Sequence, residues 1–418
     1  MLAQTPHWEE LSARGDDALA KGRYLEANKY LDAALSELQT ASQPDVRWAP
    51  VLNSLGAAKH FRGDFVGAQK CFRQALELWE QSGRAKQNVA TVLFNLGQSE
   101  YSIGDYVGAE FSLKRSLAIT EHLYPNGGLN VGSTLDWLGI VYTGEQKYAE
   151  AEQMLSQAMA ILRHTSSASR IDLAHCMNSV AELRVAQNHL ESAEQLLEQA
   201  LRIYQQELGD DHPTTAISVA KLGGFYLKGH RLELAEPLLH RALRTEERTL
   251  GPEHPRLAST LSDLALLYTE DKKFALAEPL WIRVLSIEEK MKGTKHPSLA
   301  RTLNQLSLGY IEERRYALAE PLLTRAVAVS AGDAAYAREQ ATGLRWLGLV
   351  YDHEGKSSAA ESAYREALDI WNNSGGSEDP NLLPLLRDYL AVARKNRDQE
   401  LRELEDRIKA LRSRKSRQ

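Results

Sequence analysis

Three stretches of the chain share one pattern: GHRLELAEPLLHRAL at 229–243, DKKFALAEPLWIRVL at 271–285 and ERRYALAEPLLTRAV at 313–327. Each stretch begins 42 residues after the previous one, and an alanine before the Glu-Pro pair marks its register. A period of this length is typical of proteins built from stacked structural repeats. Alanine recurs at this register along the chain in steps of 41 or 42 residues, at Ala27, Ala68, Ala109, Ala151, Ala193, Ala235, Ala277, Ala319 and Ala360.

The pattern predicts two helices in each repeat. The second helix carries small or apolar residues at spacings of four, seven and eight, as in Ala193, Leu197, Ala200 and Leu201. This spacing places them on one stripe of a helix. We expect alanine to let two helix backbones approach closely, with the larger residue filling the gap between them.

The first helix of a repeat has leucines three residues apart followed by a small residue, as in Leu135, Leu138 and Gly139. Glycine inside a helix costs ~1 kcal/mol relative to alanine. Its recurrence at one position of the repeat therefore indicates that two helices cross closely there.

Proline marks the start of several first helices, in His212-Pro213, His254-Pro255 and His296-Pro297. Proline suits the first helical position because the N–H group that it lacks would have no helical partner there. The three histidines lie one repeat apart and do not converge, so we expect capping or loop roles for them and no metal site.

A second set of prolines, Pro237, Pro279 and Pro321, falls about five residues into the predicted second helix. Proline at such a position removes one hydrogen bond or bends the first turn. The simplest interpretation is that this helix begins a residue or two earlier than the apolar stripe indicates.

These residues resemble the tetratricopeptide repeat, a helix–turn–helix unit of usually ~34 residues. The longer period and the L-G-x-x-H-P motif, at 208–213 and 250–255, resemble the kinesin-light-chain subtype, in which both helices are longer. The resemblance covers about residues 6–371. It implies an all-α fold, a right-handed superhelical α-solenoid of antiparallel helix pairs whose first helices line a concave face.

The repeat register divides most of the chain into nine units, followed by a short linker at 372–378 and a degenerate tenth repeat with a basic tail at 379–418. In this last segment Leu401, Leu404, Ile408 and Leu411 form an apolar stripe on a charged helix, as a cap at the end of a repeat array requires. A coiled-coil dimerisation helix is the alternative. The predicted units are 6–43, 44–84, 85–126, 127–168, 169–210, 211–252, 253–294, 295–334 and 335–371, within residues 1–371.

Composition excludes several classes of protein. A net charge of −6 and a pI of about 6.1 argue against broad electrostatic binding to nucleic acid or to anionic membranes. The sequence has no apolar run of ~18 residues and shows no signal-peptide pattern at its start. Cys71 and Cys176 make neither a disulfide framework nor a zinc motif. We expect a soluble, cytoplasmic protein, with a processed or exported form as the alternative.

The sequence contains no complete motif for enzyme catalysis. Gly355-Lys356-Ser357 resembles the end of a phosphate-binding loop, but Val350 stands where that loop needs a glycine. The sequence contains no G-x-S-x-G or H-E-x-x-H motif. We therefore expect no enzymatic activity, no cofactor and no metal.

The concave face implied by the resemblance is the predicted site. The two residues before the core leucine of each first helix face it, and the light-chain subtype often has two asparagines there. An amide offers a donor and an acceptor to a peptide backbone, and Trp137 and Trp346 would add apolar anchors if exposed. Alternatively, the amides are ordinary polar surface and the tryptophans pack on neighbouring repeats. The candidate residues are Asn53, Asn95, Trp137, Asn178, Lys221, Arg301, Asn304 and Arg345.

These candidates predict a non-catalytic scaffold that binds a protein or peptide segment. The basic residues are interspersed with Asp136 and Asp263, so a mixed-charge or partly apolar segment fits better than an acidic tail. The alternative function is a regulatory sensor whose superhelix changes shape on binding a small ligand or signalling peptide. We expect a monomer, with dimerisation through the C-terminal helix as the alternative.

Overall fold

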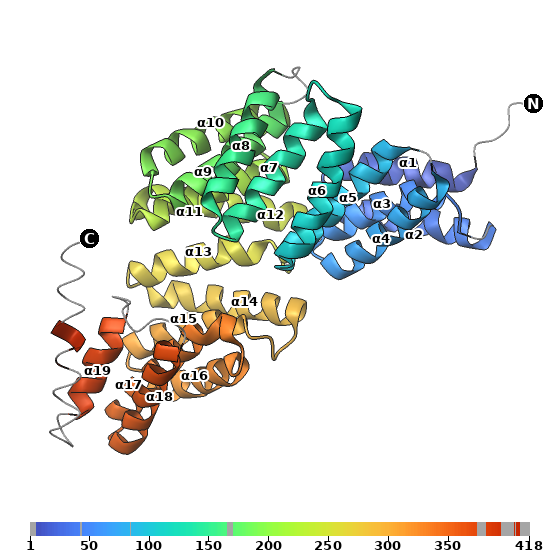
Figure 1. Ribbon diagram of the computed structural model, residues 1–418. Helices are drawn as coiled ribbons and strands as arrows, with labels where there is room; N and C mark the ends of the chain where they lie inside the picture. The colour runs from blue at the N-terminus through green and yellow to red at the C-terminus, as the bar shows by residue number, and fades with distance from the viewer. Residues whose placement is uncertain are drawn as a thin grey trace, which may run out of the picture. The chain divides into compact units, whose positions relative to one another are not determined.

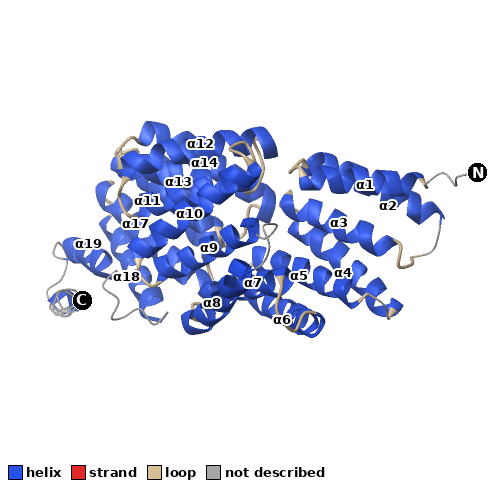
Figure 2. Ribbon diagram, turned by 90° about the horizontal axis from the view of Figure 1, so that it is seen from above, coloured by secondary structure: helices blue, strands red, loops and turns tan. Residues whose placement is uncertain are grey.

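A computed structural model describes residues 6–41, 44–83, 85–164, 170–373, 382–393, 405 and 407–409. Within these ranges all regular structure is helical and no strand occurs (Figures 1 and 2). The chain divides into two compact units, Met1–Thr260 and Leu261–Gln418. The predicted all-α solenoid of consecutive helix pairs is confirmed.

The described part of unit 1, Met1–Thr260, contains six pairs of helices in chain order. The first helices of the pairs are α1 (His7–Ala20), α3 (Trp48–Phe61), α5 (Lys86–Ser102), α7 (Leu129–Gly144), α9 (Arg170–Ala186) and α11 (Pro213–Lys228). The second helices are α2 (Tyr24–Ala41), α4 (Phe65–Ser82), α6 (Tyr106–Leu123), α8 (Tyr148–His164), α10 (Leu190–Leu208) and α12 (Leu232–Leu250).

Unit 2, Leu261–Gln418, holds most of the remaining helices. Helix α13 (Leu257–Glu270) begins just before the boundary. The helices that follow are α14 (Phe274–Lys292), α15 (Leu299–Glu312), α16 (Tyr316–Ser330), the short 3-10 helix η2 (Ala334–Tyr336), α17 (Ala337–His353), α18 (Ser357–Asn373) and α19 (Leu383–Ala393).

Small residues hold the two helices of each pair together. Ala151 and Ala158 of α8 are fully buried and flank Leu155, which is 2% exposed. Leu155 fills the space above Gly139 of α7, where an added Cβ atom would lie 2.4 Å from the leucine Cγ atom. The close crossing predicted from the recurring glycine is therefore present, and it leaves no room for a side chain.

The histidines of the three His-Pro steps accept main-chain hydrogen bonds at or just before the start of a first helix. The Nδ1 atom of His212 accepts a hydrogen bond from the Thr214 N–H at 3.1 Å, and Pro213 is the first residue of α11. His254 and His296 make the same contact, with the N–H groups of Arg256 and Ser298, each at 3.2 Å. His212 thus caps α11, and His254 and His296 make the equivalent bond in the turns before α13 and α15. All three contacts require an unprotonated Nδ1 atom.

Pro237 lies inside helix α12, five residues after its first residue Leu232, as the sequence indicated. The first helical N–H groups, of Leu234 and Ala235, already bond to the carbonyl of Arg231. The proline lies one turn further on, so the helix loses the bond that residue 237 would have donated to the carbonyl of Glu233.

The C-terminal helices share one core. Tyr364 of α18 stacks on Tyr389 of α19 at 6.1 Å between ring centroids, and Ile408 is buried in the same cluster. The other residues of the predicted apolar stripe, and the basic tail, lie outside the described residues. The cap and the coiled-coil alternative both stay predictions.

Replacing Gly139 by alanine should destabilise the protein by about 1–3 kcal/mol, because the new methyl group overpacks against Leu155. Urea unfolding monitored by circular dichroism measures this. Gly229 is the control: it is exposed, its φ is −84°, and an added Cβ would make only ordinary contacts. Gly229→Ala should be neutral or slightly stabilising. Equal losses from the two variants would contradict the close crossing.

Acid should weaken unit 1 through two buried histidines. Burial, with a smaller effect of Arg256, lowers the pKa of His60 to about 4, and burial also lowers the pKa of His254 to about 4. Because these values lie below the ordinary 6.5, the stabilisation is complete above pH 6.5 and is lost as the pH falls towards 4.

Each of these two pKa shifts corresponds to about 3 kcal/mol of folding free energy. Urea unfolding of a His60→Gln/His254→Gln double variant at pH 7 and pH 4.5 should show lower stability at pH 7 and a weaker dependence on pH. His7 is exposed, so His7→Gln serves as the control for the substitution itself and should leave the stability at pH 7 close to that of the parent. A double variant as pH-sensitive as the parent would contradict this assignment.

Candidate functional site

The first helices line the inner side of a curved stack in unit 1. Successive first helices from α1 to α9 contact one another, most closely α7 and α9 and only slightly α3 with α5 and α5 with α7. Among the described residues, successive second helices make no contacts of comparable extent. A stack whose members lie closer together on one side bends towards that side, so unit 1 presents its first helices on its inner face.

Two asparagines on this inner face form a pair across neighbouring repeats. The Nδ2 group of Asn95 on α5 donates a hydrogen bond to the Oδ1 atom of Asn53 on α3, at 2.9 Å. Both side chains are half-buried. Within the described part of the chain, the two amides make no other hydrogen bond. The NH2 group of Asn53 can therefore still donate a hydrogen bond to a ligand, and the side-chain carbonyl of Asn95 can still accept one.

Trp137 of α7 is the centre of an aromatic cluster on the inner face. Its ring meets Phe94 and Tyr101 of α5 edge to face, at 6.5 and 6.0 Å between centroids, and stacks on His175 of α9 at 5.6 Å. Trp137 is half-buried, so it packs on neighbouring repeats and still presents surface. Trp346 is only 9% exposed, which favours the packing alternative for that residue.

His175 is held by a buried carboxylate. Its Nδ1 atom lies 2.6 Å from Oδ2 of Asp136, whose side chain is 3% exposed, while 41% of the His175 side chain is exposed. Burial opposes the charged ring, but the Asp136 carboxylate outweighs it and the pKa of His175 is raised. The second oxygen of Asp136, Oδ1, is buried and has no hydrogen-bond partner among the described residues.

An ion pair between Glu182 of α9 and Lys221 of α11 lies beyond the aromatic cluster. Burial opposes ionisation of Glu182, but Lys221 outweighs it and the pKa of this carboxyl is lowered. Burial, with a smaller effect of Glu182, raises the pKa of Tyr101 to about 12. The predicted residue Lys221 is therefore neutralised from within the protein.

The sequence prediction missed Tyr101, His175 and Glu182. His175 and Glu182 lie close to one helical turn before and after the predicted Asn178, on the same helix. Extending the predicted face by one turn in each direction would have found them. Asn178 itself is 6% exposed and presents almost no surface, although its buried Oδ1 atom has no partner in the described structure.

Three predicted residues belong to unit 2, where internal contacts engage them. Asn304 of α15 is 4% exposed and donates to the main-chain carbonyl of Glu339 at 2.8 Å. The Arg301 guanidinium lies 3.3 Å from the Glu339 carboxylate, and Arg345 of α17 pairs with Asp388 of α19 at 2.6 Å. Of the three, Arg301 keeps the most exposed side chain, at 78%.

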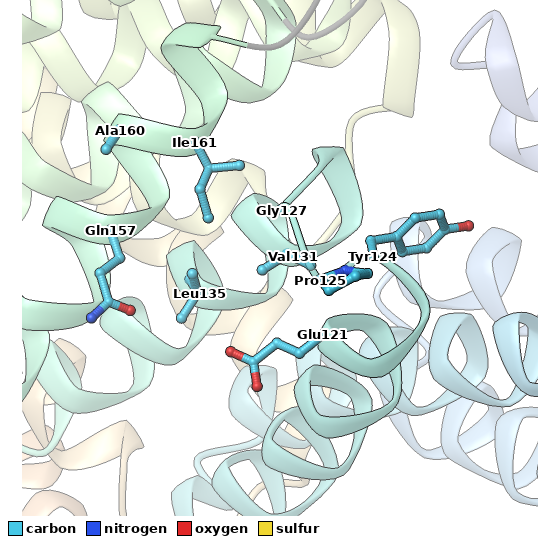
Figure 3. Close-up of a pocket in the computed structure, with 9 residues that line it drawn as sticks. All are labelled: Glu121, Tyr124, Pro125, Gly127, Val131, Leu135, Gln157, Ala160 and Ile161. Carbon is cyan, nitrogen blue, oxygen red and sulfur yellow. The ribbon is translucent and has the colours of Figure 1, made fainter.

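A cavity of about 420 Å³ lies between α6, α7 and α8 (Figure 3). None of the predicted residues lines it. Glu121 is its only titratable side chain besides Tyr124, so it lacks a converging catalytic set. Its lining residues are Glu121, Tyr124, Pro125, Gly127, Val131, Leu135, Gln157, Ala160 and Ile161.

No group of three His, Cys, Asp or Glu side chains in the described residues could hold a metal ion. No described helix combines the length and apolarity needed to cross a membrane.

Comparison with known families decides the assignment. The tetratricopeptide repeat model matches residues 49–122, 130–206, 215–287 and 258–331, and a second model of the same repeat matches 305–375. The chain belongs to the tetratricopeptide repeat family. No curated protein sequence matches the chain.

Solved structures of other repeat proteins are similar to this tetratricopeptide repeat chain. A Rap conjugation gene regulator of the plasmid pLS20, in complex with the Phr* peptide, is 15% identical over 68% of this chain and 74% of its own, with a TM-score of 0.54. A Rap protein complexed with competence and sporulation factor is 13% identical over 77% and 98%, with a TM-score of 0.50.

A third similar structure is that of a putative kinesin light chain with nearly identical TPR-like repeats from Podosopora anserina. It is 22% identical over 49% of this chain and 97% of its own, with a TM-score of 0.44. At these identities the likeness is one of fold, and the family models carry the assignment.

The effect of Asp136 on the pKa of His175 can be tested by substitution. In an Asp136→Asn variant the carboxylate that raises the pKa of His175 is gone, so burial should dominate and the pKa should fall below 6.5. NMR titration of the imidazole resonances measures this value. Asp172→Asn on the same helix is the control and should shift the pKa less. An unchanged pKa in Asp136→Asn would refute the pairing.

Proposed function

We propose that this tetratricopeptide repeat protein is a non-catalytic scaffold that binds an extended protein or peptide segment on the inner face of unit 1. The observation that carries the proposal is the juxtaposition of the Asn53–Asn95 pair with the aromatic cluster around Trp137. The free donor and acceptor of the pair match the N–H and C=O groups of an extended backbone.

The aromatic cluster supplies the apolar part of such an interaction. Trp137 is held by three neighbouring rings, so little side-chain entropy is lost when a ligand contacts it. Buried tryptophans are frequent energetic centres of interfaces. The charges nearby are of both signs, and the Glu182–Lys221 pair neutralises itself, so we favour a mixed-charge or partly apolar segment from a cytoplasmic partner.

The fold is compatible with a peptide ligand. The two Rap structures named above are of proteins complexed with a peptide and with competence and sporulation factor. Their likeness to this chain is one of fold, so the proposal rests on the inner-face residues. We therefore place the binding contacts at Asn53, Asn95 and Trp137 and not at the buried Asn178 or Asn304.

A regulatory sensor is the second candidate, and one contact favours it. The carbonyl of Phe61 on α3 lies 2.7 Å from Nε2 of His254, although 193 residues separate them. A change in the curvature of unit 1 would have to break this contact, so the fold contains a defined point of conformational change. Compaction or expansion on ligand binding, seen by small-angle X-ray scattering, would support the sensor; an unchanged scattering curve with bound ligand would count against it.

Variants of the inner face test the scaffold. A tiled peptide array should return one extended segment, and Trp137→Ala should weaken its binding at least ~30-fold, since interfacial tryptophans contribute about 2 kcal/mol or more. The double variant Asn53→Ala/Asn95→Ala should weaken binding about 3–10-fold through lost hydrogen bonds. Fluorescence anisotropy measures the affinities.

Arg202→Ala on α10 provides the control, because this side chain is 59% exposed on a second helix. It should leave binding unchanged, and the melting temperature of each asparagine variant should stay close to that of the parent. An array without any bound peptide under varied salt, or equal effects of Arg202→Ala and Trp137→Ala, would reject the scaffold proposal.

A further inference from the structure

Two turns near the start of unit 1 press against His-Pro steps that lie five repeats further along the chain. Gly22, in the turn between α1 and α2, has a φ of 71°, and a Cβ atom added there would lie 3.1 Å from Pro213. Gly63, in the turn between α3 and α4, has a φ of 80°, and an added Cβ would lie 2.4 Å from the Cγ atom of Pro255. The same spacing of five repeats thus joins two successive turns to two successive steps.

A hydrogen bond reinforces the second of these contacts. His254 is 9% exposed, and its Nδ1 atom accepts the N–H of Arg256, so its Nε2 atom carries the proton of the neutral ring. Nε2 donates this proton to the carbonyl of Phe61 at 2.7 Å. Phe61 is the last residue of α3, whose final carbonyls lack partners within the helix. One imidazole therefore joins the end of α3 to the turn before α13, across 193 residues of chain.

Aromatic and cationic side chains surround this hydrogen bond. The Phe61 ring stacks on Tyr24, the first residue of α2, at 4.8 Å and 15°. The guanidinium of Arg256 lies over the Phe61 ring, 5.4 Å from its centroid. The contact thus joins α2, α3 and the segment before α13 through packing, a hydrogen bond and a cation–π interaction.

We propose that Tyr24, Phe61, Gly63, His254, Pro255 and Arg256 form a clasp that holds unit 1 in a closed superhelical turn, and that release of this clasp is the conformational switch of the unit. The contacts between adjacent repeats fix only the local curvature. The clasp adds a long-range contact that is present in one arrangement of the repeats and absent in any more open one, which is what a two-state element requires.

The clasp has a consequence for ligand exchange, and this consequence rests on the proposed function. Helices α5, α7, α9 and α11, which carry the aromatic cluster and the Glu182–Lys221 pair, all lie between the two clasped parts of the chain. A segment bound on the inner face is then enclosed, and opening of the clasp sets how quickly it enters and leaves.

Distance measurements between spin labels test the clasp without any ligand. Arg62→Cys and Ser259→Cys place labels at exposed positions on its two sides, and both native cysteines are buried, which confines labelling to the introduced ones. In the full-length parent, double electron–electron resonance should give one short, narrow distance distribution. A broad distribution at long distances in the parent would overturn the proposal.

Two glycine variants separate the effect of the clasp on the label distances from the effect of local backbone strain. Gly63→Ala puts a methyl group against Pro255 and should shift the distribution to longer distances. Gly104 occupies the same turn position in the next repeat, with a φ of 85° and nothing within 4 Å of an added Cβ, so Gly104→Ala carries the same strain without the collision. Its distribution should match the parent, and equal distributions for the two variants would overturn the proposal.

A compensating change gives the second readout. In Gly63→Ala/Pro255→Ala the opposing ring atoms are removed, so the distribution should return towards that of the parent. His254→Asn should lengthen the distances, whereas His296→Asn should not, because the described side-chain hydrogen bonds of His296 are to Ser298 in its own turn. Failure of both comparisons would show that the contact does not hold the unit closed.

Exchange kinetics separate the clasp from the binding function. With a peptide selected on the array, Gly63→Ala should speed both association and dissociation several-fold relative to Gly104→Ala in stopped-flow fluorescence. Unchanged rates alongside longer label distances would reject gating and leave the clasp in place. If no peptide binds to the parent, the proposed function fails, whereas the label distances still decide the clasp.

Discussion

Close contact between helices at small residues is the constraint on which this protein depends. At Gly139 the backbone of α7 approaches Leu155 so closely that no Cβ atom fits, and Ala151 and Ala158 remove side-chain bulk on the other side of the leucine. Each helix pair buries its apolar stripe in this way only by stacking on the next pair. The repeat, and with it the length of the chain, follows from this one packing requirement.

The same packing creates the inner face. First helices lie nearer to one another than second helices do, so the stack curves and brings side chains from four repeats to one surface. Trp137 touches rings from α5 and α9 although their residues are about 40 positions away in the chain. The electrostatics follow from the partial burial of this surface, where Asp136 raises the pKa of His175 and Lys221 lowers that of Glu182.

The candidate site was predictable in part. Asn53, Asn95 and Trp137 lie where the repeat register placed them, because position within a repeat fixes the face of a helix. Position within the repeat does not distinguish the exposed residues of that row from the buried ones. It therefore also predicted Asn178 and Asn304, which are buried. His175 and Glu182 were missed because contact with Asp136 and Lys221, on neighbouring helices, gives them their significance.

By itself, the sequence determined the helices, their pairing and their caps, since each depends on residues within one repeat or the next: the glycine at a crossing, the alanine stripe, the histidine before a proline. Only the tertiary structure decided that Phe61 meets His254 and that Gly63 meets Pro255. The reason is cumulative: a small rotation from each repeat to the next is hidden in local packing, but summed over five repeats it decides which distant parts of the chain touch.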